Sequence, residues 1–287
     1  MTPTQERERL RAILAGPDCI TPASVWDPIS AKVAESVGFE VGMLAGSVAS
    51  ATTLAAPDLI VLTLTEFADQ IRRIKRASSL SLMLDADHGY GNALNVYRTI
   101  EECEHAGASG LSIEDTYLPT GFGRGDGETL ISIEEGVGKM RAALEARRDG
   151  DLVIAGRTSA IGITGLADTI ARVKAYAATG VDAIFLVGVT TRSDLEAIAA
   201  EVSLPIILGG GGTKLADRAY LAAQGVRIAL QGHQPFQASV RAIHDTLKAL
   251  RDGVAPADLG GLASGEMMAR ATRSSDSERW TRAFLGT

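Results

Sequence analysis

The sequence predicts a single (β/α)₈ barrel, and two observations support this prediction. Short segments rich in β-forming residues alternate with amphipathic segments along almost the whole chain of 287 residues. Eight such pairs recur at spacings of about 20–40 residues, a pattern that favours a closed parallel barrel over an open doubly wound sheet. The expected strands span residues 19–25, 40–45, 80–85, 109–114, 151–156, 182–187, 204–208 and 226–231.

The segments between these strands carry the boundary signals of helices. Asp27 can cap a helix through its carboxylate, and Pro28 suits the first helical position. Gly38 is a typical C-terminal residue for that helix, and Gly107 follows an expected helix over residues 93–106 in the same way. Helices of this kind return the chain to the start of the next parallel strand.

One barrel accounts for residues 1–253, which we expect to form a single domain. Residues 254–287 are expected to form a helical tail. This tail carries Trp280 and Phe284 among few other apolar residues, so we expect it to pack on a neighbouring subunit of a homo-oligomer.

Composition argues against several classes of function. The net charge is −7 and no block of Lys or Arg stands out, so nucleic acids and anionic membrane surfaces are poor candidate partners. No run approaches the roughly 18 apolar residues of a membrane-spanning helix, and the N-terminal residues lack the apolar core of a secretory signal. A disulfide between Cys19 and Cys103 is possible, but a large core does not require one. We therefore expect a cytoplasmic enzyme for small molecules.

Polar residues gather where the expected strands end. In a barrel of this kind, catalytic side chains lie at the carboxyl ends of the strands. These positions hold acids, an arginine, a serine and a histidine, all of which would face one pocket. They are Ser47, Asp85, Asp87, Glu114, Arg157 and His233.

The acidic residues indicate a site for a hard divalent cation. Mg²⁺ prefers oxygen ligands, often one or two carboxylates together with several waters. We expect Asp85 to bind the metal directly, and Asp58, Asp87 and Glu114 to hold its water ligands. On an ideal strand Asp85 and Asp87 share the face that lines the barrel, where two uncompensated charges are costly. The alternative is that these aspartates cap the next helix or bind loop amides.

Three further residues are candidates for binding an anionic substrate. Arg157 can hold a carboxylate through two parallel N–H donors, although an ion pair with a pocket acid is the alternative. Ser47 lies among glycines that would let its hydroxyl and nearby amides approach a carboxylate, or it is a plain turn serine. His233 follows the last strand, so we expect it to bind substrate and assist catalysis, with a structural role as the alternative.

Two loops at this end of the barrel are unusual. Residues 115–131 show no clear periodicity and are rich in Gly, Pro and Thr, and a long loop of this kind is usually functional. The run from Gly209 to Gly212 follows the expected seventh strand. It could expose backbone amides to a phosphate, or it could form a tight connection that needs positive φ angles.

Four motifs at the strand ends resemble those of the isocitrate lyase and phosphoenolpyruvate mutase superfamily, over roughly residues 19–245. They are Gly46-Ser47-Val48-Ala49-Ser50, Asp85-Ala86-Asp87-His88-Gly89-Tyr90-Gly91-Asn92, Ile113-Glu114-Asp115 and Ala155-Gly156-Arg157-Thr158. The resemblance implies a barrel whose last helix is exchanged between subunits, commonly in a homotetramer. It also implies Mg²⁺ or Mn²⁺ as cofactor, and chemistry that passes through the enolate of a 2-oxo acid.

The loop after the fourth strand distinguishes branches of this superfamily. Its C–C bond lyases carry a Lys-Lys-Cys-Gly-His type motif there, with the Cys as an acid. This chain has Gly121-Phe122-Gly123-Arg124-Gly125-Asp126 and no Cys in the loop. The phosphonate-handling members have a gating Asn in the same loop, and none occurs between Asp115 and Ile131.

The sequence is most similar to the bacterial oxaloacetate decarboxylase branch. The similar segments are Phe122-Gly123-Arg124, Glu134-Glu135-Gly136-Val137-Gly138-Lys139, Arg141-Ala142-Ala143-Leu144-Glu145-Ala146-Arg147 and Gly232-His233. This resemblance assigns Ser47, Arg157 and His233 to the substrate and Asp85 to the metal. It implies decarboxylation of oxaloacetate to pyruvate and CO₂ through an enolate that the metal stabilises. Three alternatives stay open: a phosphonopyruvate hydrolase or mutase-like P–C bond enzyme, a C–C lyase for another 2-hydroxy acid, and a barrel that binds a metabolite without turnover.

Overall fold

A computed structural model describes residues 1–123 and 127–286. Residues 124–126 lie outside the described part of the chain, and with them Arg124 of the loop motif. Within the described residues, eight parallel strands form one sheet in the order β1 to β8, as predicted for a (β/α)₈ barrel. They are β1 (Ala23–Ser24), β2 (Val41–Leu44), β3 (Ser81–Asp85), β4 (Gly110–Glu114), β5 (Val153–Thr158), β6 (Ala183–Val187), β7 (Ile206–Gly209) and β8 (Val226–Ala229).

The sheet closes through the residues just before β1. Ile20 forms a parallel bridge with Ile228 of β8. The Ile20 amide donates to the Arg227 carbonyl at 2.9 Å, and the Ala229 amide donates to the Ile20 carbonyl at 2.9 Å. The expected first strand, residues 19–25, therefore contacts both of its neighbours, first β8 and then β2.

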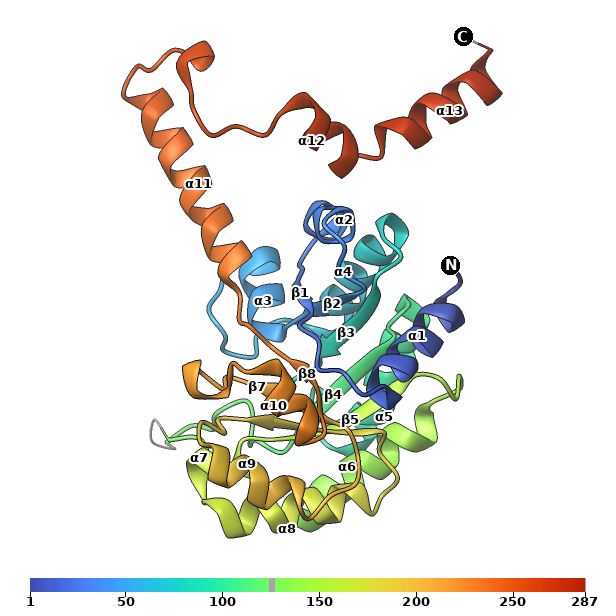
Figure 1. Ribbon diagram of the computed structural model, residues 1–287, viewed down its shortest axis with the longest axis vertical. Coiled ribbons are helices and arrows are strands. Elements are labelled where there is room, and N and C mark those ends of the chain that lie inside the picture. The colour runs from blue at the N-terminus through green and yellow to red at the C-terminus, as the bar shows by residue number, and fades with distance from the viewer. Residues whose placement is uncertain (124–126, 287) are drawn as a thin grey trace.

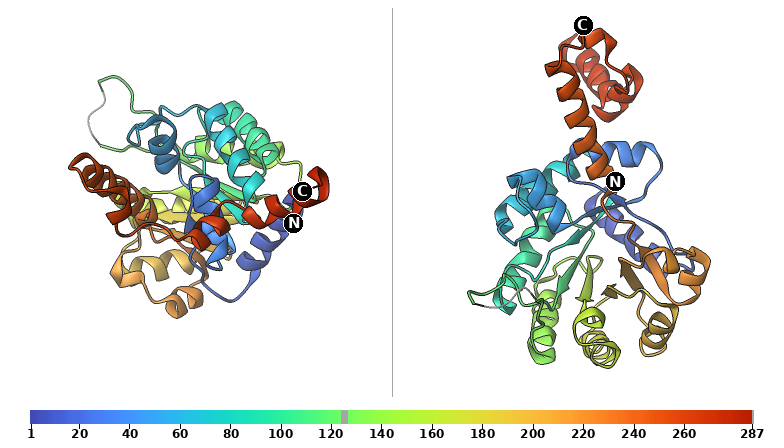
Figure 2. Two further views of the ribbon diagram at one scale, coloured as in Figure 1. Left: turned by 90° about the horizontal axis from the view of Figure 1, so that it is seen from above. Right: turned by 90° about the vertical axis from the view of Figure 1, so that its left-hand side faces the viewer.

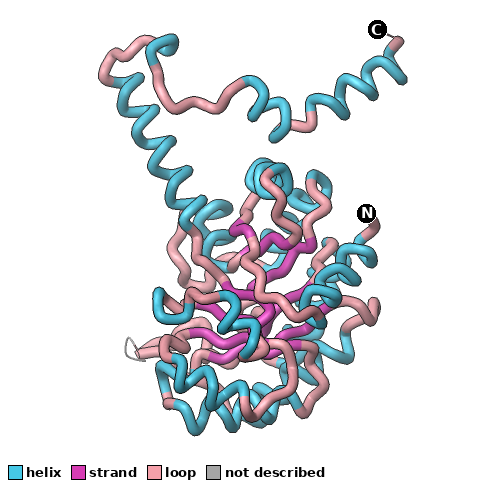
Figure 3. The backbone as a smooth tube through the Cα atoms, in the orientation of Figure 1, coloured by secondary structure: helices cyan, strands magenta, loops and turns pink. Residues whose placement is uncertain are grey.

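Helices surround the strands on the outside, as Figure 3 shows with cyan helices around magenta strands. Asp27 caps α2 as predicted, and Gly107 ends α5 with a φ of 104°. The helices are α1 (Pro3–Ala15), α2 (Pro28–Ser36), α3 (Gly46–Leu54), α4 (Leu64–Ala77), α5 (Ala93–Ala106), α6 (Ile133–Ala146), α7 (Ala160–Ile163), α8 (Leu166–Ala177), α9 (Arg192–Ala199), α10 (Arg218–Ala223), α11 (Gln234–Arg251), α12 (Gly265–Ala271) and α13 (Ser274–Leu285).

The N-terminal helix α1 closes one end of the barrel. Leu10 and Leu14 of α1 pack into an apolar cluster with strand residues that include Met83, Val153 and Phe185. Because α1 contacts the segments that precede β4 and β5, it covers the amino ends of the strands. The carboxyl ends remain free for the site.

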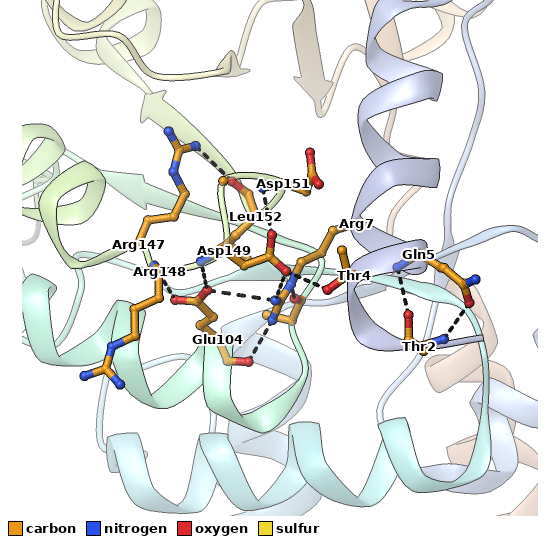
Figure 4. A network of polar contacts seen from close by, with 12 residues as sticks. Thr2, Thr4, Gln5, Arg7, Glu104, Arg147, Arg148, Asp149, Asp151 and Leu152 are labelled. Carbon is orange, nitrogen blue, oxygen red and sulfur yellow. Dashed lines mark hydrogen bonds and ion pairs between the residues drawn. The ribbon is translucent and has the colours of Figure 1, made fainter.

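Arg7 fixes α1 to the barrel through a buried polar network (Figure 4). Its Nε donates to the Ala108 carbonyl and its Nη2 to the Glu104 carbonyl, both at 2.9 Å. Its Nη1 forms an ion pair with Asp149 at 2.6 Å. Every side-chain nitrogen of this buried guanidinium therefore has a partner, as burial of a charge requires.

We expect Arg7→Ala to destabilise the fold by about 3–5 kcal/mol, because it removes the charged partner of Asp149 and a donor from two buried carbonyls. Urea denaturation at fixed protein concentration measures the change. Arg148→Ala is the control, since Arg148 is exposed and its ion pair with Glu101 is worth about 0–1 kcal/mol. Equal stabilities of the two variants would show that the contacts of Arg7 do not hold α1 to the barrel.

The helix that follows β8 contacts the barrel only near its start, where Phe236 packs edge-on against Trp26 with ring centres 5.4 Å apart. Figure 1 shows α11 extending away from the barrel, and the two views of Figure 2 agree. No residue of α11 is buried, although Val240, Ile243 and Leu247 form an apolar face. We predicted that this helix belongs to the barrel domain of residues 1–253. In the described chain, however, no other element covers its apolar face.

Two further points concern membranes and cysteines. None of the helices in residues 1–123 and 127–286 combines the length and apolar character needed to cross a bilayer.

Cys19 and Cys103 are both buried and free, so the possible disulfide between them does not form.

Candidate active site

The carboxyl ends of the strands enclose a cavity with two adjoining lobes of about 640 and 350 Å³. Ser47, Asp58, Asp85 and Arg157 line both lobes. The larger lobe extends to His233 and the glycine run after β7, and the smaller lobe extends to Asp87 and Glu114. All seven residues predicted to form the site therefore line this cavity.

Asp85 lies at the centre of the cavity, as the last residue of β3. Its Oδ1 accepts a hydrogen bond from the Ser112 hydroxyl at 3.3 Å, and its Oδ2 forms an ion pair with Arg157. The backbone of β3 fixes the position of this carboxylate, since Asp85 pairs in register with Ser112 of β4.

Arg157 forms ion pairs with two acids of the cavity. Its guanidinium contacts Asp85, and its Nη2 lies 3.2 Å from Glu114 Oε2. The guanidinium carbon also lies 5.4 Å from the centre of the Phe185 ring. The ion-pair alternative from the sequence is therefore present, but Nε is buried without a hydrogen-bond partner and is left as a donor.

Asp87 reaches the cavity by a route that the sequence did not predict. The chain leaves the strand after Asp85, and Asp87 has a φ of +49°, in the left-handed region. The expectation that Asp85 and Asp87 share a strand face was therefore wrong. Asp87 instead lies against Gly46, where an added Cβ would be 2.4 Å from Asp87 Oδ2, so a side chain at position 46 would displace the Asp87 carboxylate.

Three acids of the cavity, Asp58, Asp87 and Glu114, hold their protons more tightly than free carboxyl groups do. Burial raises the pKa of Asp87 well above its ordinary value, and repulsion from Asp85 and Glu114 adds to this. Burial raises the pKa of Glu114 to about 7, with Arg157 acting in the opposite direction. Burial and the nearby Asp85 also raise the pKa of Asp58. These three raised pKa values indicate that the carboxylates of the cavity carry more negative charge than Arg157 offsets.

The smaller lobe has the composition of a site for a hard cation. Among the described residues, five carboxyl groups and one guanidinium line it: Asp58, Asp85, Asp87, Glu114, Glu128 and Arg157. No three acidic, histidine or cysteine side chains of residues 1–123 and 127–286 are grouped closely enough to form a complete protein cage. This donor set fits Mg²⁺, which keeps several waters and takes few direct carboxylates, and such a cation would offset the excess charge.

Ser47 lies in the first turn of α3, which begins at Gly46. No side chain caps this helix, so its first backbone N–H groups are left for other acceptors. The start of a helix attracts anions, and the Asp87 carboxylate already lies against Gly46. The turn that bears Ser47 is thus suited to a carboxylate in the cavity.

His233 lies at the start of α11 and lines the larger lobe. Its Nδ1 is 2.8 Å from the Ser24 hydroxyl, which leaves Nε2 for a ligand. Burial lowers its pKa, with Asp85 and Asp58 acting in the opposite direction, so the ring is neutral at pH 7. Sequence reasoning missed Ser24, although it ends the first strand and reading that strand end would have found it.

Two loops border the cavity. In the glycine run, Gly210 and Gly212 have φ angles of +71° and +61°, so the alternative of a tight turn with positive φ is present. The loop after β4 is held at its base by an antiparallel bridge between Thr116 and Leu130. Thr116 also donates to Glu114 at 3.1 Å, which links this loop to the acids.

A barrel whose strand ends hold a cluster of acids beside an arginine defines the class of the protein. The sequence pattern of the phosphoenolpyruvate phosphomutase family matches residues 10–251, and the chain belongs to this family. The resemblance found in the sequence is thus confirmed.

Relatives within this family are more specific. The chain is 57% identical to an oxaloacetate decarboxylase of Bradyrhizobium diazoefficiens over 95% of this chain and 94% of that protein. It is 56% identical to an oxaloacetate decarboxylase of Rhodopseudomonas palustris over 100% and 99% of the two chains.

Solved structures extend the comparison to other activities on the same fold. A phosphonopyruvate hydrolase bound to oxalate and Mg²⁺ is 29% identical, with a TM-score of 0.86 over 99% of this chain and 100% of that one. An oxaloacetate acetylhydrolase bound to 3,3-difluorooxalacetate is 26% identical, with a TM-score of 0.86 over 99% and 98% of the two chains.

Proposed function

We propose that this chain decarboxylates oxaloacetate to pyruvate and CO₂ with the aid of Mg²⁺ or Mn²⁺. The observation that carries the proposal is one cavity that combines an acid cluster, a buried arginine with a free Nε and a neutral histidine. Identity above 50% to oxaloacetate decarboxylases over almost the whole chain supports this substrate.

Asp85 would bind the cation directly, and Asp58, Asp87 and Glu114 would hold its waters. The acid cluster supports this assignment, because its charge exceeds that of Arg157. A bound divalent cation would supply a Lewis acid for the negative charge that develops on the 2-oxo oxygen of the substrate.

Arg157 and Ser47 would hold the C1 carboxylate of the substrate. The guanidinium of Arg157, which lines both lobes, and the uncapped first turn of α3 are donors that suit a carboxylate. With C1 held there, the C3–C4 bond breaks, CO₂ leaves from C4, and the electron pair of that bond forms the enolate. A proton on C3 then completes pyruvate.

His233 would contact the part of the substrate that leaves as CO₂. The ring is neutral, and Ser24 occupies its Nδ1. If the Ser24 hydroxyl donates to Nδ1, Nε2 carries the proton and can donate to the C4 carboxylate or to C3. We infer that this geometry makes His233 both a substrate-binding and a catalytic residue.

An assay with two substrates tests the proposal. With Mg²⁺, oxaloacetate should yield pyruvate well above a blank that contains cation and no enzyme, and phosphonopyruvate should yield no phosphate. Phosphate release that is faster than pyruvate formation would favour the alternative P–C bond activity. Neither product from any 2-oxo acid would favour a barrel that only binds a metabolite.

We also propose that the chain forms a homotetramer in which residues 254–287 and α11 pack on neighbouring subunits. Uncovered apolar side chains on α11 and α2 support this. On α11, Ile243 and Leu247 are 59% and 61% exposed. Ile243 also lines a groove of about 900 Å³ between α11 and α2, together with Ile29, Val33 and Val37. Apolar side chains that are exposed together on neighbouring elements are typical of an interface, and a helix of a second subunit would cover them.

Light scattering at micromolar protein should give the mass of a tetramer. Leu247→Glu should lower this mass, because it inserts a charge into the apolar face of α11. Arg241→Gln, on the exposed polar part of the same helix, should leave the mass unchanged. A monomer for the unmodified chain would contradict the proposal.

A further inference from the structure

The turn that presents Asp87 to the cavity has an unfavourable backbone. Asp87, Gly89, Tyr90 and Gly91 all have positive φ, and two of these residues carry a side chain. Side chains disfavour such angles, so surrounding contacts must hold the turn in place.

Three neighbouring elements provide these contacts through three consecutive carbonyl groups. The Asp87 carbonyl accepts from the Glu114 amide of β4 at 2.9 Å. The Gly89 carbonyl accepts from the Thr99 hydroxyl of α5 at 3.1 Å. The His88 carbonyl, between them, accepts from Lys139 Nζ of α6 at 2.9 Å. Lys139 is thus the charged member of the set.

Lys139 is an unusual residue for this place. Lys139 is 2% exposed. No carboxylate of the described residues lies within 4.0 Å of its Nζ, and its hydrogen bond is to the His88 carbonyl. Burial lowers its pKa, and Glu135, Glu114 and Asp115 act in the opposite direction from a longer range. A buried lysine is costly, so a single bond to a backbone carbonyl calls for an explanation beyond packing.

We propose that Lys139 is a positioning residue for the cation site, which holds the His88 carbonyl and thereby fixes the turn that presents Asp87. The inference rests on the proposed function, since it assumes that a divalent cation binds beside Asp85. Lys139 belongs to α6 and does not itself line the cavity.

The two roles that Lys139 could have predict opposite effects on cation binding. A positive charge near the acids opposes the approach of a second cation, so its loss alone would strengthen binding. Loss of a contact that positions Asp87 would instead weaken binding. Calorimetric titration of the full chain with Mg²⁺ or Mn²⁺ therefore separates the two roles without an activity assay.

Lys139→Met is the variant of choice, because methionine fills the space of the lysine stem and removes a buried charge. We expect about 10–100-fold weaker cation binding, as for changes in groups that hold metal ligands. We expect kcat at saturating cation to fall by a much smaller factor than the cation affinity. Lys139→Gln keeps an N–H donor and should recover part of the affinity; it also serves if the methionine variant fails to fold.

Lys75→Met is the matched control. Lys75 is also largely buried and also donates to a backbone carbonyl, that of Leu80. Unlike Lys139 it also pairs with an acid, Glu6 at 2.5 Å, and it lies before β3 at the closed end of the barrel. This variant should lose stability and keep its cation affinity. Unchanged or tighter binding by folded Lys139→Met would overturn the proposal. If unmodified protein binds no cation, the proposed function fails first.

Discussion

Asp85→Ala should abolish turnover of oxaloacetate, with a loss of more than about 10³-fold. The carboxylate lies at the centre of the cavity, lines both lobes and is the proposed direct ligand of the cation. Its loss removes both the ligand and, through the cation, the electrostatic stabilisation of the enolate, which is usually a large contribution to catalysis. Initial rates of pyruvate formation measure the effect, and EDTA should reproduce it reversibly in the unmodified protein.

The neighbouring acids should matter less. Asp87→Ala and Glu114→Ala should weaken cation affinity about 10–100-fold and regain activity at high cation, because we propose that these groups hold waters and not the metal itself. Asp69→Ala, an exposed acid on α4, is the control and should keep full activity. Full turnover by folded Asp85→Ala would show that the cation site has been assigned wrongly.

The fold could be predicted because local patterns report directly on parallel strands and helix ends. All eight expected strands overlap the observed ones, and α5 spans the predicted residues 93–106. The residues at the strand ends could then be assigned to one cavity, because parallel strands in a closed barrel end at the same side. This reasoning needs only the order of elements along the chain.

Contacts between elements were harder to predict. The left-handed Asp87 depends on carbonyl partners from β4, α5 and α6, which no local pattern encodes. The ion pair of Arg157 with Glu114 depends on the register of β4 and β5, in which these two residues are opposite each other. Such details follow from tertiary packing, which overrides the ideal geometry of a single strand.

The course of α11 illustrates a further limit. Its apolar residues follow the same spacing as those of a helix that packs on its own barrel. The sequence pattern indicates that one face will be covered, but it does not say by which surface. Only the three-dimensional arrangement reveals that this face is open within the chain (Figure 1).

His233→Ala should lower kcat for oxaloacetate by about 10²–10⁴-fold if its Nε2 assists proton transfer. The ring is neutral and its Nδ1 is occupied by Ser24, so Nε2 is the atom that can serve the substrate. A residue that only positions the substrate would raise KM and change kcat much less. The split between kcat and KM therefore separates the two roles.

Two variants give this experiment its controls. Ser24→Ala removes one hydrogen bond that orients the ring, worth about 0.5–1.5 kcal/mol, so the expected loss is about 2–10-fold. His105→Ala, on the exposed side of α5, should leave the rate unchanged. If His233→Ala keeps its kcat and raises only KM, proton transfer must come from another group, and His233 is then a binding residue alone. The catalytic proton would in that case reach C3 from water or from Asp58, which lines the same lobe as His233, since Nδ1 of His233 faces Ser24.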